Sequence, residues 1–125
     1  MTKLEAIIEQ FQKALSRLKE VLAMETTDVV RDSAIQRFEF TLDLSWKALK
    51  AYLQESKGII CASPKECFRE GYKQGIIGYD EEWIDIVDMR NETTHMYNEK
   101  MAQGVFEKLP NTIKHFEKLL KAISG

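Results

Sequence analysis

Residues that interrupt regular structure are scarce in this chain, whose 125 residues include two prolines and six glycines. The alternating apolar and polar pattern of a half-buried strand is also absent. Apolar residues instead recur at steps of three and four along most of the sequence. These absences argue against a strand-rich fold and predict a set of helices.

Long apolar runs and a large excess of one charge are missing as well. No stretch approaches the roughly 20 apolar residues that a membrane helix needs. The opening sequence MTKLEAIIEQFQ is amphipathic and carries two glutamates, so we expect no signal peptide. The formal net charge is −2, which argues against a broadly basic nucleic-acid binder but leaves a small local RNA site open.

Cysteine is represented by Cys61 and Cys67 alone. Two cysteines are too few for a disulfide framework, and their spacing fits no common zinc pattern. We therefore expect buried or half-buried thiols in a reduced, cytoplasmic protein.

The apolar periodicity predicts four long helices and one short one. The first spans about residues 2–24 and carries one apolar stripe. The second spans about residues 28–56 and is apolar on two sides, which is typical of a central helix. A short helix occupies about residues 63–75, a fourth starts near residue 80, and the last runs over about residues 98–123.

Capping residues support these boundaries. Thr2 with Glu5, and Ser63 with Glu66, form capping boxes at two helix starts. Gly58 and Gly75 end helices, and Asp80 is an acidic N-cap. Pro110 should kink the last helix or divide it in two. Short connections favour antiparallel neighbours, so the prediction is an all-α fold: an antiparallel up-and-down four-helix bundle with a short extra helix, in one domain over residues 1–125.

A narrow polar strip on the second helix has two interpretations. Glu39, Asp43 and Lys47 follow one another at i, i+4 spacing between the two apolar faces. The strip is either a solvated face with weak pair support or the lining of an interface or site. Spacing alone leaves both open.

The segment from Met89 to Asn98 carries the best candidates for chemistry. Arg90 extends the apolar face of the fourth helix, where a guanidinium needs an acidic, phosphate or dimer partner. On an unbroken helix Arg90 and His95 would point about 140° apart. Thr93 and Thr94 are β-branched and favour an end to the helix, which would let the two side chains converge.

A converging arginine and histidine suit one reaction. Histidine moves protons near neutral pH, and the planar guanidinium of arginine can donate paired hydrogen bonds to a negative charge that develops on a phosphoryl group. The pair could promote attack of a ribose 2′-hydroxyl on its neighbouring phosphate without a metal. The alternative is structural: Arg90 pairs with an acid, and His95 caps a turn.

Other catalytic templates fit less well. Glu92 and His95 form an E-x-x-H pair, but a di-iron bundle needs a second such motif, and His115 has Thr112 in the place of the second glutamate. Phosphate-loop, dinucleotide and H-E-x-x-H signatures are absent. We expect no cofactor and no metal site.

The same residues resemble a known family. Arg90 to His95, with a polar residue directly after the arginine, resembles the R-x4-6-H signature of the HEPN superfamily, and Tyr97 extends it to R-x4-H-x-Y. The sequence RFEFTLDLSWKALK, residues 37–50, resembles the second helix of nucleotidyltransferase substrate-binding proteins. Residues 63–66 and 68–70 fit them too, and the resemblance covers essentially the whole chain in order.

This resemblance implies a function that spacing alone does not. Family members are antiparallel helical bundles, usually dimeric, encoded beside a minimal nucleotidyltransferase. In toxin–antitoxin versions the HEPN protein is a metal-independent RNase that the transferase silences by adding AMP to the motif tyrosine. By position, Arg90 would stabilise the phosphorane, His95 would act as general acid or base, Asn91 would support both, and Tyr97 would be the modified hydroxyl.

Three hypotheses therefore stay open. The chain is an endoribonuclease toxin that leaves 2′,3′-cyclic phosphate ends, a non-catalytic substrate-binding subunit of a nucleotidyltransferase, or a purely structural dimeric bundle. The first two are compatible, and we favour a two-component system with a nearby transferase as partner.

Overall fold

The computed structural model describes residues 1–78 and 80–125, the side chain of Asp80 excepted. Its elements are α1 (Lys3–Leu22), α2 (Asp28–Lys57), α3 (Pro64–Lys73), α4 (Asp80–Glu92), the short 3-10 helix η1 (Thr93–His95) and α5 (Glu99–Ile123). No strand occurs among these described residues. No described helix is long and apolar enough to cross a membrane.

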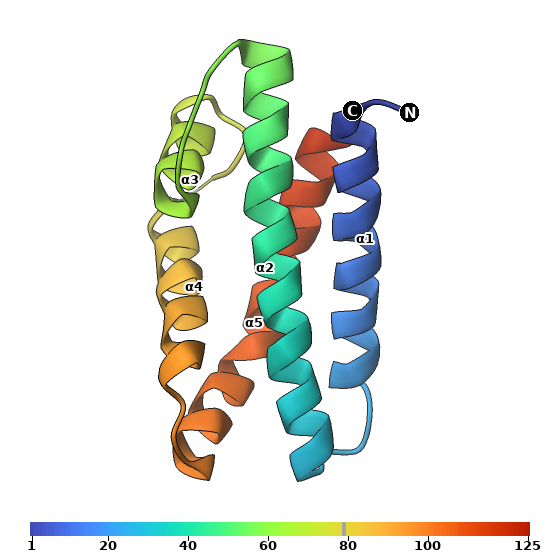
Figure 1. Cartoon of the computed structure of the whole chain (residues 1–125), viewed down its shortest axis with the longest axis vertical. Helices are drawn as coiled ribbons and strands as arrows, with labels where there is room; N and C mark the ends of the chain where they lie inside the picture. The colour runs from blue at the N-terminus through green and yellow to red at the C-terminus, as the bar shows by residue number, and fades with distance from the viewer. Residues whose placement is uncertain (79) are drawn as a thin grey trace.

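The bundle consists of α1, α2 and α5, with α3 and α4 together on the remaining side (Figure 1). In the view of Figure 1, α1 runs down and α2 returns upward beside it. The connection after α2 descends, α3 runs back up, α4 runs down, and α5 climbs behind α2 toward the end where the N-terminus lies. The predicted antiparallel up-and-down bundle is therefore confirmed, and the short extra helix α3 lies beyond the upper end of α4 in this view.

The predicted helix ends agree with the structure within about two residues. Thr2 Oγ1 accepts a hydrogen bond from the Glu5 N–H, and Ser63 Oγ accepts one from the Glu66 N–H. Gly58 ends α2 with φ of 67°, a left-handed conformation that glycine adopts without steric cost. The expectation that Asp80 caps α4 lies outside the described residues.

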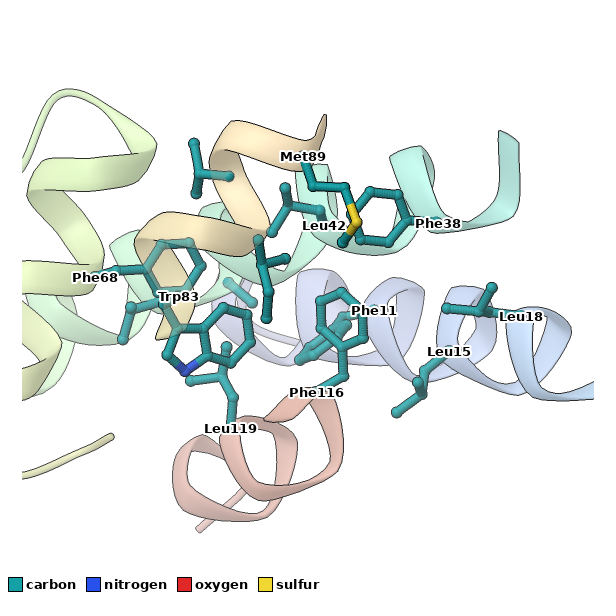
Figure 2. Packing of buried hydrophobic residues seen from close by; sticks show 14 of the residues in the cluster. Phe11, Leu15, Leu18, Phe38, Leu42, Phe68, Trp83, Met89, Phe116 and Leu119 are labelled. Atoms are coloured by element: carbon teal, nitrogen blue, oxygen red, sulfur yellow. The ribbon is translucent and has the colours of Figure 1, made fainter. Parts of the chain in front are cut away.

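Aromatic rings from the five described α-helices share the core, with Phe38 contributed by α2 (Figure 2). Phe68 stacks on Trp83 with ring centroids 4.4 Å apart, and Trp83 meets the Phe116 ring edge-on at 5.6 Å. Phe116 in turn meets Phe11 at 6.2 Å. These contacts join α3, α4, α5 and α1, so α4 is fixed to the rest of the bundle by large buried side chains.

The prediction of free thiols is wrong. Cys61 and Cys67 form a disulfide, with their Cα atoms 5.3 Å apart, and both residues are buried. The sequence count argued against a framework of several bridges, but it could not reveal that the connection between α2 and α3 folds back. That return brings the two side chains together and ties the connection to the first turn of α3.

Pro110 does not divide the last helix, since α5 continues through it from Glu99 to Ile123. Proline removes one backbone donor and leaves the carbonyl four residues earlier without its usual partner. Pro110 is exposed, so water can reach that side of the helix, and apolar residues before and after the proline keep both halves on the core.

Candidate active site

Arg90 lies in the last turn of α4, and its guanidinium reaches two carboxylates of α2. Nη1 is 2.9 Å from Glu39 Oε2, and Nη2 is 3.4 Å from Asp43 Oδ2. Because these acids lie one turn apart on α2, a single planar fork meets both. The expectation that this arginine needs a partner is thus met by acids of the polar strip. The Arg90 side chain remains 24% exposed, so part of it is accessible to solvent.

Thr93 joins the same cluster. Its hydroxyl accepts a hydrogen bond from Arg90 Nη1 at 3.2 Å, and lies 2.9 Å from Glu39 Oε2 and 2.6 Å from the Arg90 carbonyl oxygen, either of which can accept its proton. Sequence reasoning assigned this threonine only a helix-ending role. Its chemistry could not be anticipated, because it depends on which residues of α2 face it.

The predicted loosening at the threonines is confirmed. The α-helix ends at Glu92, and Thr93–His95 continues as one 3-10 turn. Thr94 donates to the Asn91 carbonyl oxygen at 2.8 Å, which closes this turn. The Asn91 residue is exposed, as is His95.

His95 is paired with Tyr97. Nδ1 of His95 lies 2.8 Å from the Tyr97 hydroxyl, and Tyr97 is 79% exposed. If the hydroxyl donates to Nδ1, the proton of the neutral ring resides on Nε2, which then donates a hydrogen bond. In the opposite tautomer Nδ1–H donates to the hydroxyl oxygen, and Nε2 is free to accept a proton as a base. Among the described hydrogen bonds none joins Arg90 to His95: Arg90 bonds to Glu39, Asp43 and Thr93, and His95 bonds to Tyr97.

One atom of the site is left without a partner. Arg90 Nε is buried and has no hydrogen bond to any described residue. Desolvating an N–H without an acceptor is unfavourable, so the terminal nitrogens carry all of the guanidinium's bonds.

The second histidine belongs to a different place. His115 on α5 contacts Glu82 at 3.4 Å and meets the Trp83 ring edge-on. Burial lowers the pKa of His115, an effect that Glu82 opposes and Lys114 and Lys118 reinforce. Within the described residues no group of three His, Cys, Asp or Glu side chains could hold a metal ion.

Comparison with known proteins identifies the family. A model described as nucleotidyltransferase substrate binding protein like matches residues 6–124. The chain belongs to this family. The family resemblance inferred from the R-x4-H-x-Y segment and residues 37–50 is thereby confirmed.

Individual proteins are also similar to this chain. A Haemophilus influenzae protein named probable ribonuclease HepT is 32% identical over 100 residues, which cover 77% of this chain and 68% of the relative. A crystal structure from Thermus thermophilus is 41% identical, with a TM-score of 0.85 over 92% of this chain and 99% of that one.

Two further structures share the fold. A Haemophilus influenzae structure, described as the fold of a substrate binding domain of a nucleotidyltransferase, is 27% identical, with a TM-score of 0.74 over 98% of this chain and 97% of that one. A tri-AMPylated Shewanella oneidensis HEPN toxin in complex with MNT antitoxin has a TM-score of 0.78 over 98% of both chains. At 16% identity, the latter likeness is one of fold.

Proposed function

We propose that this chain is a metal-independent endoribonuclease toxin that a minimal nucleotidyltransferase silences by adding AMP to Tyr97. The observation that carries the proposal is the 2.8 Å contact between His95 Nδ1 and the exposed Tyr97 hydroxyl, five residues after the partly exposed Arg90. A relative named probable ribonuclease HepT supports the reaction class.

In the proposed reaction a ribose 2′-hydroxyl attacks the adjacent phosphorus and the 5′-oxygen of the next nucleotide leaves. The products are a 2′,3′-cyclic phosphate and a 5′-hydroxyl. His95 removes the proton from the nucleophile or supplies one to the leaving oxygen. Arg90, which is partly exposed, stabilises the extra negative charge on the phosphorane, and Asn91 offers a further hydrogen bond to it.

Silencing follows from the tyrosine's position. The Tyr97 oxygen attacks the α-phosphorus of ATP, pyrophosphate leaves, and the hydroxyl proton is lost. The resulting phosphodiester replaces the hydroxyl that contacts His95 and sets a bulky anion beside it. Both changes oppose entry of an RNA phosphate. The tri-AMPylated state of the structurally similar Shewanella toxin is the precedent for this step.

A cleavage assay tests the nuclease. Labelled RNA is incubated with the unmodified chain in EDTA, and product ends are identified by mass spectrometry. We expect 2′,3′-cyclic phosphate ends from wild type and a rate at least about a hundredfold lower for His95→Ala, in line with the loss of a general acid or base. His115→Gln is the control histidine variant and should cleave normally. Retained cleavage by His95→Ala, or none by wild type on any RNA, would contradict the proposal.

A second candidate function is favoured by the ion pairs of Arg90. Since Glu39 and Asp43 already engage the fork, the chain could serve as a non-catalytic substrate-binding subunit of the transferase. Protein mass after incubation with the neighbouring transferase and ATP separates the two. Addition of AMP that Tyr97→Phe abolishes favours the toxin; a stable complex with unchanged mass and no cleavage favours the binding subunit.

A further inference from the structure

A long basic groove runs between α1 and α2. One hollow of about 520 Å³ is lined by Lys13, Arg17, Arg37, Phe40, Asp43 and Lys47, among others. A second hollow of about 460 Å³ adjoins it through Lys47 and adds Lys3, Trp46 and Lys50. We call these two hollows the α1–α2 groove.

Charge in the groove opposes that of the whole chain. Its lining carries six lysines and arginines against two acids, Asp43 and Glu55, although the formal net charge of the chain is −2. A groove of about 680 Å³ between α4 and α5 has the reverse composition, with five acids against one lysine and His115. The small net charge of the whole chain is therefore the sum of two surfaces with opposite charge.

Several of the groove's cations lack an acidic partner. Among the described residues no ion pair involves Arg17, Arg37 or Lys47, and Lys13 pairs with Glu9 only at an exposed site. Exposed pairs of that kind are weak. These side chains are consequently available to an external anion that extends over more than one charge.

An aromatic ring accompanies the cations. Phe40 is 47% exposed within the lining of the larger hollow. In the other, the Lys50 ammonium lies 5.9 Å from the Trp46 ring centroid. Alternation of cations with an exposed aromatic face is the arrangement that single-stranded nucleic acids bind, since the backbone meets the charges and a base stacks on the ring.

Asp43 connects the groove to the candidate active site. Asp43 lines the larger hollow, and its carboxylate lies 3.4 Å from Arg90 Nη2. A strand that follows the groove therefore arrives beside the guanidinium. We propose that the α1–α2 groove binds single-stranded RNA and directs it to Arg90 and His95; this inference rests on the nuclease function proposed above.

The test measures binding apart from cleavage. Fluorescence anisotropy follows a labelled, fully 2′-O-methylated RNA of about 12 nucleotides, a length within the site sizes of single-strand binders. This probe lacks the attacking hydroxyl, so it reports affinity alone. The groove variant is Lys13→Gln/Arg17→Gln/Arg37→Gln, and the matched control is Lys108→Gln/Lys114→Gln/Lys121→Gln on α5, with the same change of charge.

We expect the groove variant to bind at least about tenfold more weakly than the control, with a salt dependence of log affinity shallower by about 2, as for three lost contacts to a single strand. Phe40→Ala should also weaken binding by about tenfold through lost stacking. Circular dichroism confirms that each variant is folded.

Three results would overturn the inference. One is equal binding by the groove and control variants. Another is a groove variant that changes oligomeric state in light scattering while RNA affinity stays the same, which would make this face an interface between copies. The third is loss of the transferase complex without loss of RNA binding. If the groove variant lowers RNA affinity but wild type does not cleave RNA, the result contradicts the proposed nuclease activity and supports RNA binding by the groove.

Discussion

The energetic role of Arg90 depends on the pair of acids that hold it. Because the side chain is 24% exposed and its partners are 27% and 42% exposed, the ion pairs are partly screened by solvent. We expect a coupling free energy of about 1 kcal/mol between Arg90 and Glu39, near the upper end for exposed pairs. Urea unfolding of Arg90→Gln, Glu39→Gln and the double variant measures it, with Lys13→Gln and Glu9→Gln as an exposed reference pair. A coupling as small as in the reference pair would refute a structural role for the cluster.

His115 makes the stability of the folded protein depend on pH. Burial lowers the pKa of His115 from 6.5 in the folded state, so the unfolded chain binds a proton first as the pH falls. The free energy of unfolding is therefore fully retained above about pH 6.5 and decreases as the pH falls below it through the folded pKa. Thermal unfolding of wild type and His115→Gln between about pH 7.5 and 5 tests this, and wild type should lose more stability. Glu82→Gln should steepen the loss, because Glu82 opposes the shift. Parallel curves for wild type and His115→Gln would contradict it.

Sequence reasoning located the important residues better than it located their contacts. Arg90 stands out in the sequence because a guanidinium on an apolar helix face needs a partner, and the α2 strip stands out because three polar residues interrupt two apolar faces. The particular pairing needs the register of α4 against α2, which apolar periodicity does not specify. Thr93 was missed as a bonding residue for the same reason.

At the scale of elements, the disulfide is the feature that changes an expectation. Cys61 and Cys67 close a short loop with a sequence separation of six. Loop-closure entropy for such a loop corresponds to about 2 kcal/mol of stabilisation. We expect a phosphine reductant to lower the melting temperature of wild type but not of Cys61→Ala/Cys67→Ala. Equal melting with and without reductant, together with two alkylatable thiols, would show that the dithiol form prevails in the tested state.

Helix boundaries were predictable because their determinants are local. A capping hydroxyl three residues before its N–H, or a glycine with positive φ after the last turn, acts within a few residues. Pro110 shows the limit of such rules: the local penalty was recognised correctly, but burial of Val105, Leu109, Phe116 and their neighbours on both sides of the proline holds one continuous helix. Tertiary packing therefore decided a question that local preference had left open.

At the scale of the whole molecule, the net charge does not reveal how charge is distributed. A net charge of −2 argued against a broadly basic nucleic-acid binder and left a small local RNA site open. The fold instead gathers cations along α1 and α2 and acids between α4 and α5. Charge distribution, rather than its sum, governs steering of a polyanion, and that distribution depends on which helix faces lie together.

Assembly is the last property that follows at this scale. Tyr97 and Met101 expose apolar surface where α4 passes into α5, with 79% and 40% of each residue accessible, and this is the segment that family resemblance places near a dimer interface. We expect light scattering to give a mass of about twice 14.5 kDa, because an isologous two-fold contact is the commonest way to cover such a patch.

Met101→Asp should shift the equilibrium toward monomer, since it sets a charge against its own copy across the axis. Ile60→Asp, at an exposed apolar residue on the α2–α3 connection, is the control and should leave the mass unchanged. A monomeric wild type, or dissociation by the control alone, would remove this segment as the interface and would require each active site to function within a single chain.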